Sequence, residues 1–184
     1  WLILQELVCF DMGVTRFAEL LKHEIAKNYK GLDLEIYGDP AGDFRSQTDE
    51  TTPFQILRHM GIRAVPAPSN DVSLRIEAVE AALTRMVEGK AGFLLNYNCV
   101  NLKKGFNGGY HYRRLQTSGD RYDEKPMKNR YSHVHDALQY LLMGAGEGKT
   151  LISGRATRPT VVKTRGWDIF SGQRKSVWRN KMNG

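Results

Sequence analysis

Strand-like and helix-like patterns alternate along the first hundred residues, and this alternation constrains the fold more than any other feature. The runs that predict strands lie at residues 1–10, 32–37, 62–66 and 92–97. Helical spacing of apolar residues falls between them, at residues 14–29, 53–60 and about 72–87. Strands separated by helices favour an α/β domain with helices packed on a mixed sheet.

Local signals place the ends of two of these helices. Thr52-Pro53 has the form of an N-cap followed by proline at the first helical position, and Gly61 stops that helix. The next helix should run through Val87 and end at Gly89. Its candidate caps are Ser69, Asn70 and Asp71.

The first and last helices are predicted to be amphipathic. The first, with Gly31 as its C-cap, should bury Phe17, Leu20, Leu21 and Ile25. The last, which Ser132 can cap, should bury Val134, Leu138, Leu141 and Leu142. Between them, residues 109–124 flank the turn-like tetrapeptide TSGD and predict a hairpin.

Positive charge is concentrated at the end of the chain. Residues 148–184 carry nine Lys or Arg and one acid, Asp168, whereas the other 147 residues carry 18 basic and 19 acidic side chains. Two interpretations stay open for this basic tail: a solvated segment, or one that binds phosphates or an acidic partner. We therefore divide the chain into a domain at 1–147 and a tail at 148–184.

The cysteines and the hydropathy pattern narrow the class of protein. Cys9 and Cys99 lie in apolar stretches and form neither a disulfide framework nor a zinc motif, so we expect a reducing, intracellular setting. No apolar run approaches the length that spans a bilayer.

Asp39 and the pair His133 and Asp136 are the candidates for chemistry. Asp39 follows a predicted strand, at the edge where α/β sheets usually place functional groups, although Asp-Pro-Ala-Gly is also a good turn. His133 and Asp136 are three positions apart, so they share one helix face and could bind one metal ion. The alternative is an acid favoured by the helix dipole, with His133 merely near the cap. We expect His135 to be structural or exposed.

Three segments in order carry a resemblance to a known family. They are GDPAGDFRSQTDETTPFQIL, GIRAVPAPSNDVSLRIEAVEAAL and KNRYSHVHDALQYLL. Together they resemble the C-terminal nuclease domain of the large terminase subunit of tailed bacteriophages, over about residues 1–147. The resemblance implies a ribonuclease-H-like fold that cuts double-stranded DNA with two divalent ions, Mg²⁺ or Mn²⁺.

The resemblance also implies roles for the candidate residues. Asp39 would be the acid at the end of a later strand, and Asp136 the acid on a late helix, with His133 joining the metal site. Because two ions in such sites lie about 3.5–4 Å apart, we expect the two carboxylates to be roughly 4–8 Å from each other. Residues 109–124 would form the hairpin that the family places beside its active site.

Two parts of the family's pattern are not found in residues 1–184. The family's first-strand acid should precede the segment that begins at Trp1, and Asp11 is a poor substitute because it follows that strand. The phosphate-binding loop of the family's ATPase domain does not occur either. We therefore expect residues 1–184 to form an incomplete sheet and to cleave weakly, and an extension upstream of Trp1 to restore cleavage.

Basic residues between the last predicted strand and the last helix are candidates for binding DNA, with tyrosines interleaved among them. They are Lys103, Lys104, Arg113, Arg114, Lys125, Lys128 and Arg130. The family's further partners would be a portal ring, a small terminase subunit and an upstream ATPase domain, with no membrane. The location would be the host cytoplasm, at the viral procapsid.

Two other functions stay open. The first is another ribonuclease-H-like nuclease, such as a junction resolvase or an integrase. The second belongs to a different class: a non-catalytic module that docks on DNA or on a portal ring through its basic tail. Metal-dependent nicking of DNA separates the second from the nuclease.

Overall fold

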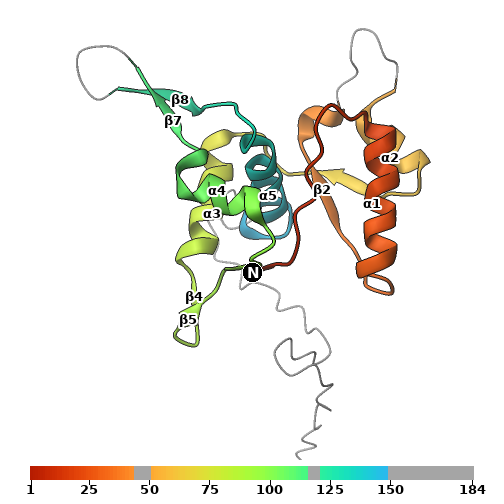
Figure 1. Ribbon diagram of the computed structural model, residues 1–184, viewed down its shortest axis with the longest axis horizontal. Coiled ribbons are helices and arrows are strands. Elements are labelled where there is room, and N and C mark those ends of the chain that lie inside the picture. The colour runs from red at the N-terminus through yellow and green to blue at the C-terminus, as the bar shows by residue number, and fades with distance from the viewer. Residues whose placement is uncertain (44–50, 116–120, 149–184) are drawn as a thin grey trace, which may run out of the picture.

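The computed structural model describes residues 1–43, 51–115 and 121–148 (Figure 1). Its helices are α1 (Val14–Asn28), α2 (Pro53–His59), α3 (Val72–Thr84), α4 (Val100–Lys104) and α5 (Ser132–Gly144), with a 3-10 turn, η1 (Pro40–Asp43), and a π-turn, η2 (Gly105–Gly109). Its strands are β1 (Leu2–Ile3), β2 (Ile36–Gly38), β3 (Ala64–Pro66), β4 (Met86–Val87), β5 (Lys90–Ala91), β6 (Leu94–Leu95), β7 (Tyr112–Arg114) and β8 (Tyr122–Pro126). None of the described helices is long and apolar enough to cross a membrane.

The strands pair two by two. β1 with β6 and β2 with β3 are parallel pairs, whereas β4 with β5 and β7 with β8 are antiparallel pairs. The predicted α/β class is confirmed, since helices alternate with strands and both parallel and antiparallel pairs occur. In place of one mixed sheet, the described residues form four two-stranded sheets.

Two hydrophobic clusters hold the helices on these strands. The larger joins α3, α4 and α5 to β1, and Leu138, Leu142 and Met143 of α5 lie at its centre. The smaller joins α1, α2 and β3 through Ala18, Phe54, Ile62 and Ala64. Figure 1 shows α3, α4 and α5 gathered on one side and α1, α2 and β2 on the other. The predicted inward face of α5 is confirmed, because Leu138 and Leu142 are buried and Val134 and Leu141 pack against the cluster.

The first predicted strand is much shorter than its apolar run. Only Leu2 and Ile3 pair with β6, and Leu4 is exposed. Beyond Ile3 the chain leaves the sheet, and the Glu6 carboxylate accepts the backbone N–H groups of Asn101 and Leu102. These are donors that the start of α4 would otherwise leave unpaired. The strands predicted at 32–37 and 92–97 are also shorter than expected, and are β2 (Ile36–Gly38) and β6 (Leu94–Leu95).

The third helix also ends earlier than predicted. Its N-cap is Asp71, one of the three candidates, which accepts the Leu74 N–H at 3.0 Å. The prediction that it runs to Val87 is wrong, because α3 stops at Thr84 and the chain turns back through β4 and β5. Glu88 and Gly89 both have positive φ, which is the conformation of a tight two-residue hairpin turn. The glycine that was expected to end the helix instead makes this turn.

Several smaller predictions are settled by the backbone. The predicted N-cap at Thr52 with Pro53 at the first helical position is confirmed, and Thr52 and Gln55 also form a complete capping box. Leu20 of α1 is exposed, and Ala18 is the buried residue of that helix. Ser132 is not the N-cap of α5, which is Tyr131; its hydroxyl instead donates to the Asn129 carbonyl oxygen. The hairpin is present as β7 and β8, whereas its TSGD turn and the basic tail from Lys149 lie outside the described residues.

A buried carboxylate ties the end of the described chain to its beginning. Glu147 receives two hydrogen bonds from the Arg85 guanidinium, at 2.6 and 2.7 Å, and one from the Trp1 indole N–H at 2.6 Å. Burial alone would raise the pKa of Glu147, but the hydrogen bonds from Arg85 and Trp1 outweigh it. The pKa of Glu147 therefore lies below its usual range, and the carboxylate favours the folded state.

Replacing Glu147 with glutamine should lower the free energy of unfolding at neutral pH by about 1–3 kcal/mol, because Arg85 loses a charged partner. Since the folded-state pKa is depressed, this contribution is present above the ordinary carboxyl pKa of 4.5 and is lost as the pH falls below it. Urea unfolding between pH 3 and 7 measures both effects. Glu80→Gln, on the exposed face of α3, is the matched control. Identical pH dependence in Glu147→Gln and the unaltered chain would contradict the assignment.

Candidate functional site

A close helix–strand contact positions the two candidate acids. A side chain at Gly144 of α5 would lie 2.2 Å from the Tyr37 ring of β2, so only glycine allows β2 to approach this closely. Asp39 directly follows Gly38, the last residue of β2, and Tyr140 lies one helical turn before Gly144 on α5. Asp39 raises the pKa of Tyr140, so the end of β2 lies beside this part of α5. Asp136 lies on the same helix, one turn before Tyr140.

Both Asp39 and Asp136 raise the pKa of one side chain, that of Tyr140. It is buried, and its hydroxyl donates to the Asn70 side-chain oxygen at 2.6 Å. Burial raises the pKa of Tyr140, and the Arg75 charge opposes this. Hydrogen bonding and charge from Asp39, together with the charge of Asp136, raise the pKa further. Tyr140 is therefore a neutral phenol at any physiological pH, and the structure brings Asp39 and Asp136 to the same surroundings.

Cationic side chains contact both oxygens of Asp136. The guanidinium Nη1 of Arg75 lies 3.4 Å from Oδ1, and the ammonium group of Lys128 contacts Oδ2. The Arg75 guanidinium also lies over the Tyr140 ring, 4.6 Å from its centroid. Arg75 and Tyr140 come from α3 and α5, the two helices with the most extensive mutual packing. The acid on α5 is thus held from the neighbouring helix.

The structure bears on both interpretations of Asp39. Its Oδ1 accepts the Ala41 N–H at 2.8 Å, and its carbonyl oxygen accepts the Gly42 N–H at 2.9 Å, so the residue does make a turn. The same carboxylate is exposed at the end of β2 and acts on Tyr140. The turn fixes Asp39 in place without burying it, so the turn does not exclude a binding role.

The two histidines of the helix differ in their surroundings. His135 is buried, stacked on Tyr110 with 4.8 Å between ring centroids, and its Nε2 lies 3.2 Å from the Leu102 carbonyl oxygen. Burial lowers the pKa of His135, so this residue is a neutral part of the core. Of the two expectations for His135, structural or exposed, the structural one is confirmed. His133 is exposed on the first turn of α5. Across residues 1–43, 51–115 and 121–148, no three His, Cys, Asp or Glu side chains gather as a metal-binding group, and the ligand role of His133 stays a prediction.

The predicted DNA-binding residues lie on exposed parts of α4 and the hairpin. Lys103 and Lys104 occupy the last turn of α4, and Arg113 pairs with Asp123 across the hairpin at 3.0 Å. Exposed side chains are also found for Arg114, Lys125, Lys128 and Arg130. A pocket on the hairpin is lined by Arg113, Asp123 and residues 124–128, and so includes the lysine that contacts Asp136.

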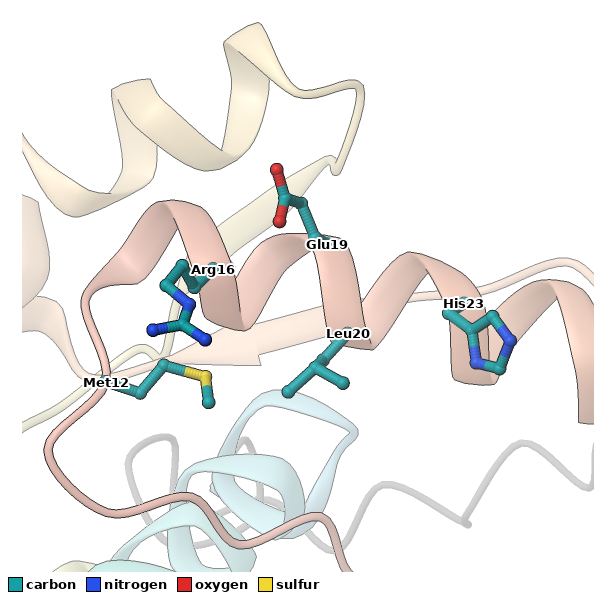
Figure 2. Close-up of a pocket in the computed structure, with 5 residues that line it drawn as sticks. All are labelled: Met12, Arg16, Glu19, Leu20 and His23. Atoms are coloured by element: carbon teal, nitrogen blue, oxygen red, sulfur yellow. The ribbon is translucent and has the colours of Figure 1, made fainter.

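A separate pocket runs along α1 and contains none of the predicted site residues. Figure 2 shows its lining, which consists of Met12, Arg16, Glu19, Leu20 and His23. Leu20 was expected to face the core but lies here. The pocket is open and lies on a different helix from Asp136.

Sequence reasoning missed Arg75 and Asn70. The signal for Arg75 was available, because the buried residues of α3 are Arg75, Ala78, Val79 and Ala82, and this spacing places the arginine on the apolar face of its helix. A charge on such a face needs a partner, which is Asp136. Asn70 had been considered only as a cap, and nothing in its local sequence indicates a bond to Tyr140.

The chemistry available at this site can be stated from the side chains alone. It combines two carboxylates, a buried guanidinium, an exposed ammonium group and a neutral phenol. Comparison with known proteins adds no assignment: no protein-family model, curated protein or solved structure matches the chain.

Proposed function

We propose that the chain is the metal-dependent endonuclease domain of a viral DNA-packaging terminase, on a ribonuclease-H-like scaffold. The observation that carries the proposal is the convergence of Asp39 and Asp136 on Tyr140. These are the strand-end acid and the helix acid that the sequence motifs single out. The two acids are 97 positions apart in the sequence, and in the fold both raise the pKa of Tyr140.

The donor set fits a hard divalent cation. Carboxylate oxygens are the ligands that Mg²⁺ and Mn²⁺ prefer, and water or phosphate oxygens usually complete their coordination. Two carboxylates about 4 Å apart repel each other by roughly 4 kcal/mol at an effective dielectric of 20 and so require positive charge nearby. Arg75 and Lys128 already supply positive charge to Asp136.

Each side chain then has a role in phosphodiester hydrolysis. Asp39 and Asp136 would hold the divalent ions, which when bound polarise the phosphate and make water a better nucleophile. Arg75 orients Asp136 from α3, and the hydrogen bond from Tyr140 to Asn70 links α5 to the start of α3. His133 would be a further ligand or would orient the attacking water.

The surface next to these acids suits double-stranded DNA. The β7–β8 hairpin and the segment that follows it present Arg114, Lys125, Lys128 and Arg130 to solvent. Such residues bind phosphates without reading base sequence, which suits an enzyme that cuts packaged DNA. A portal ring, a small terminase subunit, an ATPase domain in the same polypeptide and a location at the procapsid belong to this proposal.

Nicking of supercoiled plasmid DNA by the full chain tests the proposal. We expect slow nicking that requires Mn²⁺ and stops when a chelator is added, together with saturable Mn²⁺ binding by the protein alone. DNA binding with neither Mn²⁺ binding nor nicking would contradict a nuclease and favour the docking module.

A further inference from the structure

Asp136 has two positively charged partners with very different surroundings. The Arg75 side chain is 6% exposed, whereas the Lys128 side chain is 69% exposed. Arg75 contacts Oδ1 and Lys128 contacts Oδ2, so each oxygen of the carboxylate has its own cationic partner. The pair therefore divides into a buried partner and a solvent-exposed one.

Arg75 cannot leave Asp136 without a large cost. Its guanidinium lies between α3 and the Tyr140 ring, and its Nε is already buried without a hydrogen-bond partner among the described residues. Removing one partner of a buried charge pair leaves the other charge uncompensated, which is strongly destabilising. Arg75 is thus a fixed counter-charge.

Lys128 is free to exchange its partner. An exposed ion pair contributes little to stability, since water solvates both charges and the lysine side chain loses freedom in the pair. The backbone of Lys128, in contrast, is held near Asp136 by the hydrogen bonds of the next residue, Asn129. The Asn129 side chain donates to the Gly109 carbonyl oxygen at 2.7 Å, and its N–H donates to the Ser132 hydroxyl. The ammonium group can therefore move away from Asp136 while its attachment point stays in place.

We propose that Lys128 is an exchangeable counter-charge at Asp136. It neutralises Oδ2 when no divalent ion is bound and gives up this oxygen when Mg²⁺ or Mn²⁺ binds, while Arg75 keeps Oδ1 oriented. Lys128 thereby sets the metal affinity of the site, in addition to lying among the residues that face DNA. This inference rests on the proposed metal site.

Mn²⁺ titration of the full chain, in the absence of DNA, tests the exchange. Lys128→Met should bind Mn²⁺ roughly two- to fivefold more tightly than the unaltered chain, the range expected when an exposed competing ion pair is removed. Lys125→Met removes the same charge from the same segment without a contact to Asp136, and its affinity should change less than that of Lys128→Met. Asp136→Asn should lose most of the binding in either background.

Thermal unfolding separates the two partners. Arg75→Gln should lower the midpoint temperature of unfolding, because it removes a buried charge. Lys128→Met should leave this temperature nearly unchanged, because its ion pair is exposed. If the chain binds Mn²⁺ through Asp136 but Lys128→Met binds no more tightly than Lys125→Met, the exchange is wrong and the metal site stands. If neither the unaltered chain nor Lys128→Met binds Mn²⁺, both the exchange and the proposed function are wrong. A midpoint lowered by Lys128→Met and not by Arg75→Gln would also overturn the assignment of the two roles.

Discussion

Replacing Asp136 with asparagine is expected to reduce Mn²⁺-dependent nicking of supercoiled DNA by about a hundredfold or more, the usual loss when a charge-stabilising contact at a reacting centre is removed. The amide has nearly the shape of the carboxylate, but it leaves the buried Arg75 without a charged partner, so rates are compared at a temperature where urea unfolding shows the variant folded. What is lost is the negative charge that Arg75 and Lys128 now face. Rates are measured from the decay of the supercoiled form at several Mn²⁺ concentrations.

Asp33→Asn is the matched control for this substitution. Asp33 is exposed in the loop before β2, and its replacement makes the same chemical change six residues from Asp39. Its nicking rate should remain within about twofold of the unaltered chain, as for surface substitutions away from a site. Equal nicking by Asp136→Asn and Asp33→Asn would mean that Asp136 holds no catalytic ion.

Replacing Gly144 with valine should produce the largest structural effect. A side chain at this position would meet the Tyr37 ring at 2.2 Å, so β2 and α5 must separate. Overpacking of this kind costs about 1–3 kcal/mol, and here it also moves Asp39 away from Tyr140 and Asp136. Urea unfolding should show the loss of stability, and Mn²⁺ titration should show weaker binding.

The companion variant for this prediction is Tyr37→Ala. If the valine acts through the Tyr37 ring, the double variant should recover part of the stability that Gly144→Val loses, a coupling that a double-mutant cycle measures. Gly13→Ala is the control, because an added methyl group there meets no atom within 4 Å. Purely additive effects of the two substitutions would show that the contact does not hold β2 against α5.

The elements that the sequence predicts best are those whose signals are local. The N-cap at Thr52, a cap within residues 69–71 and the apolar face of α5 depend on residues within one or two turns, and all three are confirmed. The length of β1 depends on a distant partner, whereas the end of α3 depends on a nearby turn that the helix prediction missed. Glu6 leaves the strand direction to cap α4, and Glu88-Gly89 turns the chain back.

The two acids of the site could be predicted because their signals are also local, whereas the residues that contact them could not. Asp39 and Asp136 stand out because each follows a recognisable local pattern, at a strand end and in a helix. Arg75 and Asn70 matter only through contacts with α5, more than 60 residues further along the chain. A single sequence gives no register between α3 and α5, and so it cannot show which polar residue of one helix meets which acid of the other.

Diffraction from Mn²⁺-soaked crystals, recorded where manganese scatters anomalously, tests the shared site most directly. We expect an anomalous peak about 2 Å from a carboxylate oxygen of both Asp39 and Asp136, with Arg75 still contacting Asp136 and Lys128 turned away from it. Manganese bound at other residues, or the two carboxylates on opposite sides of β2, would contradict the proposed metal site.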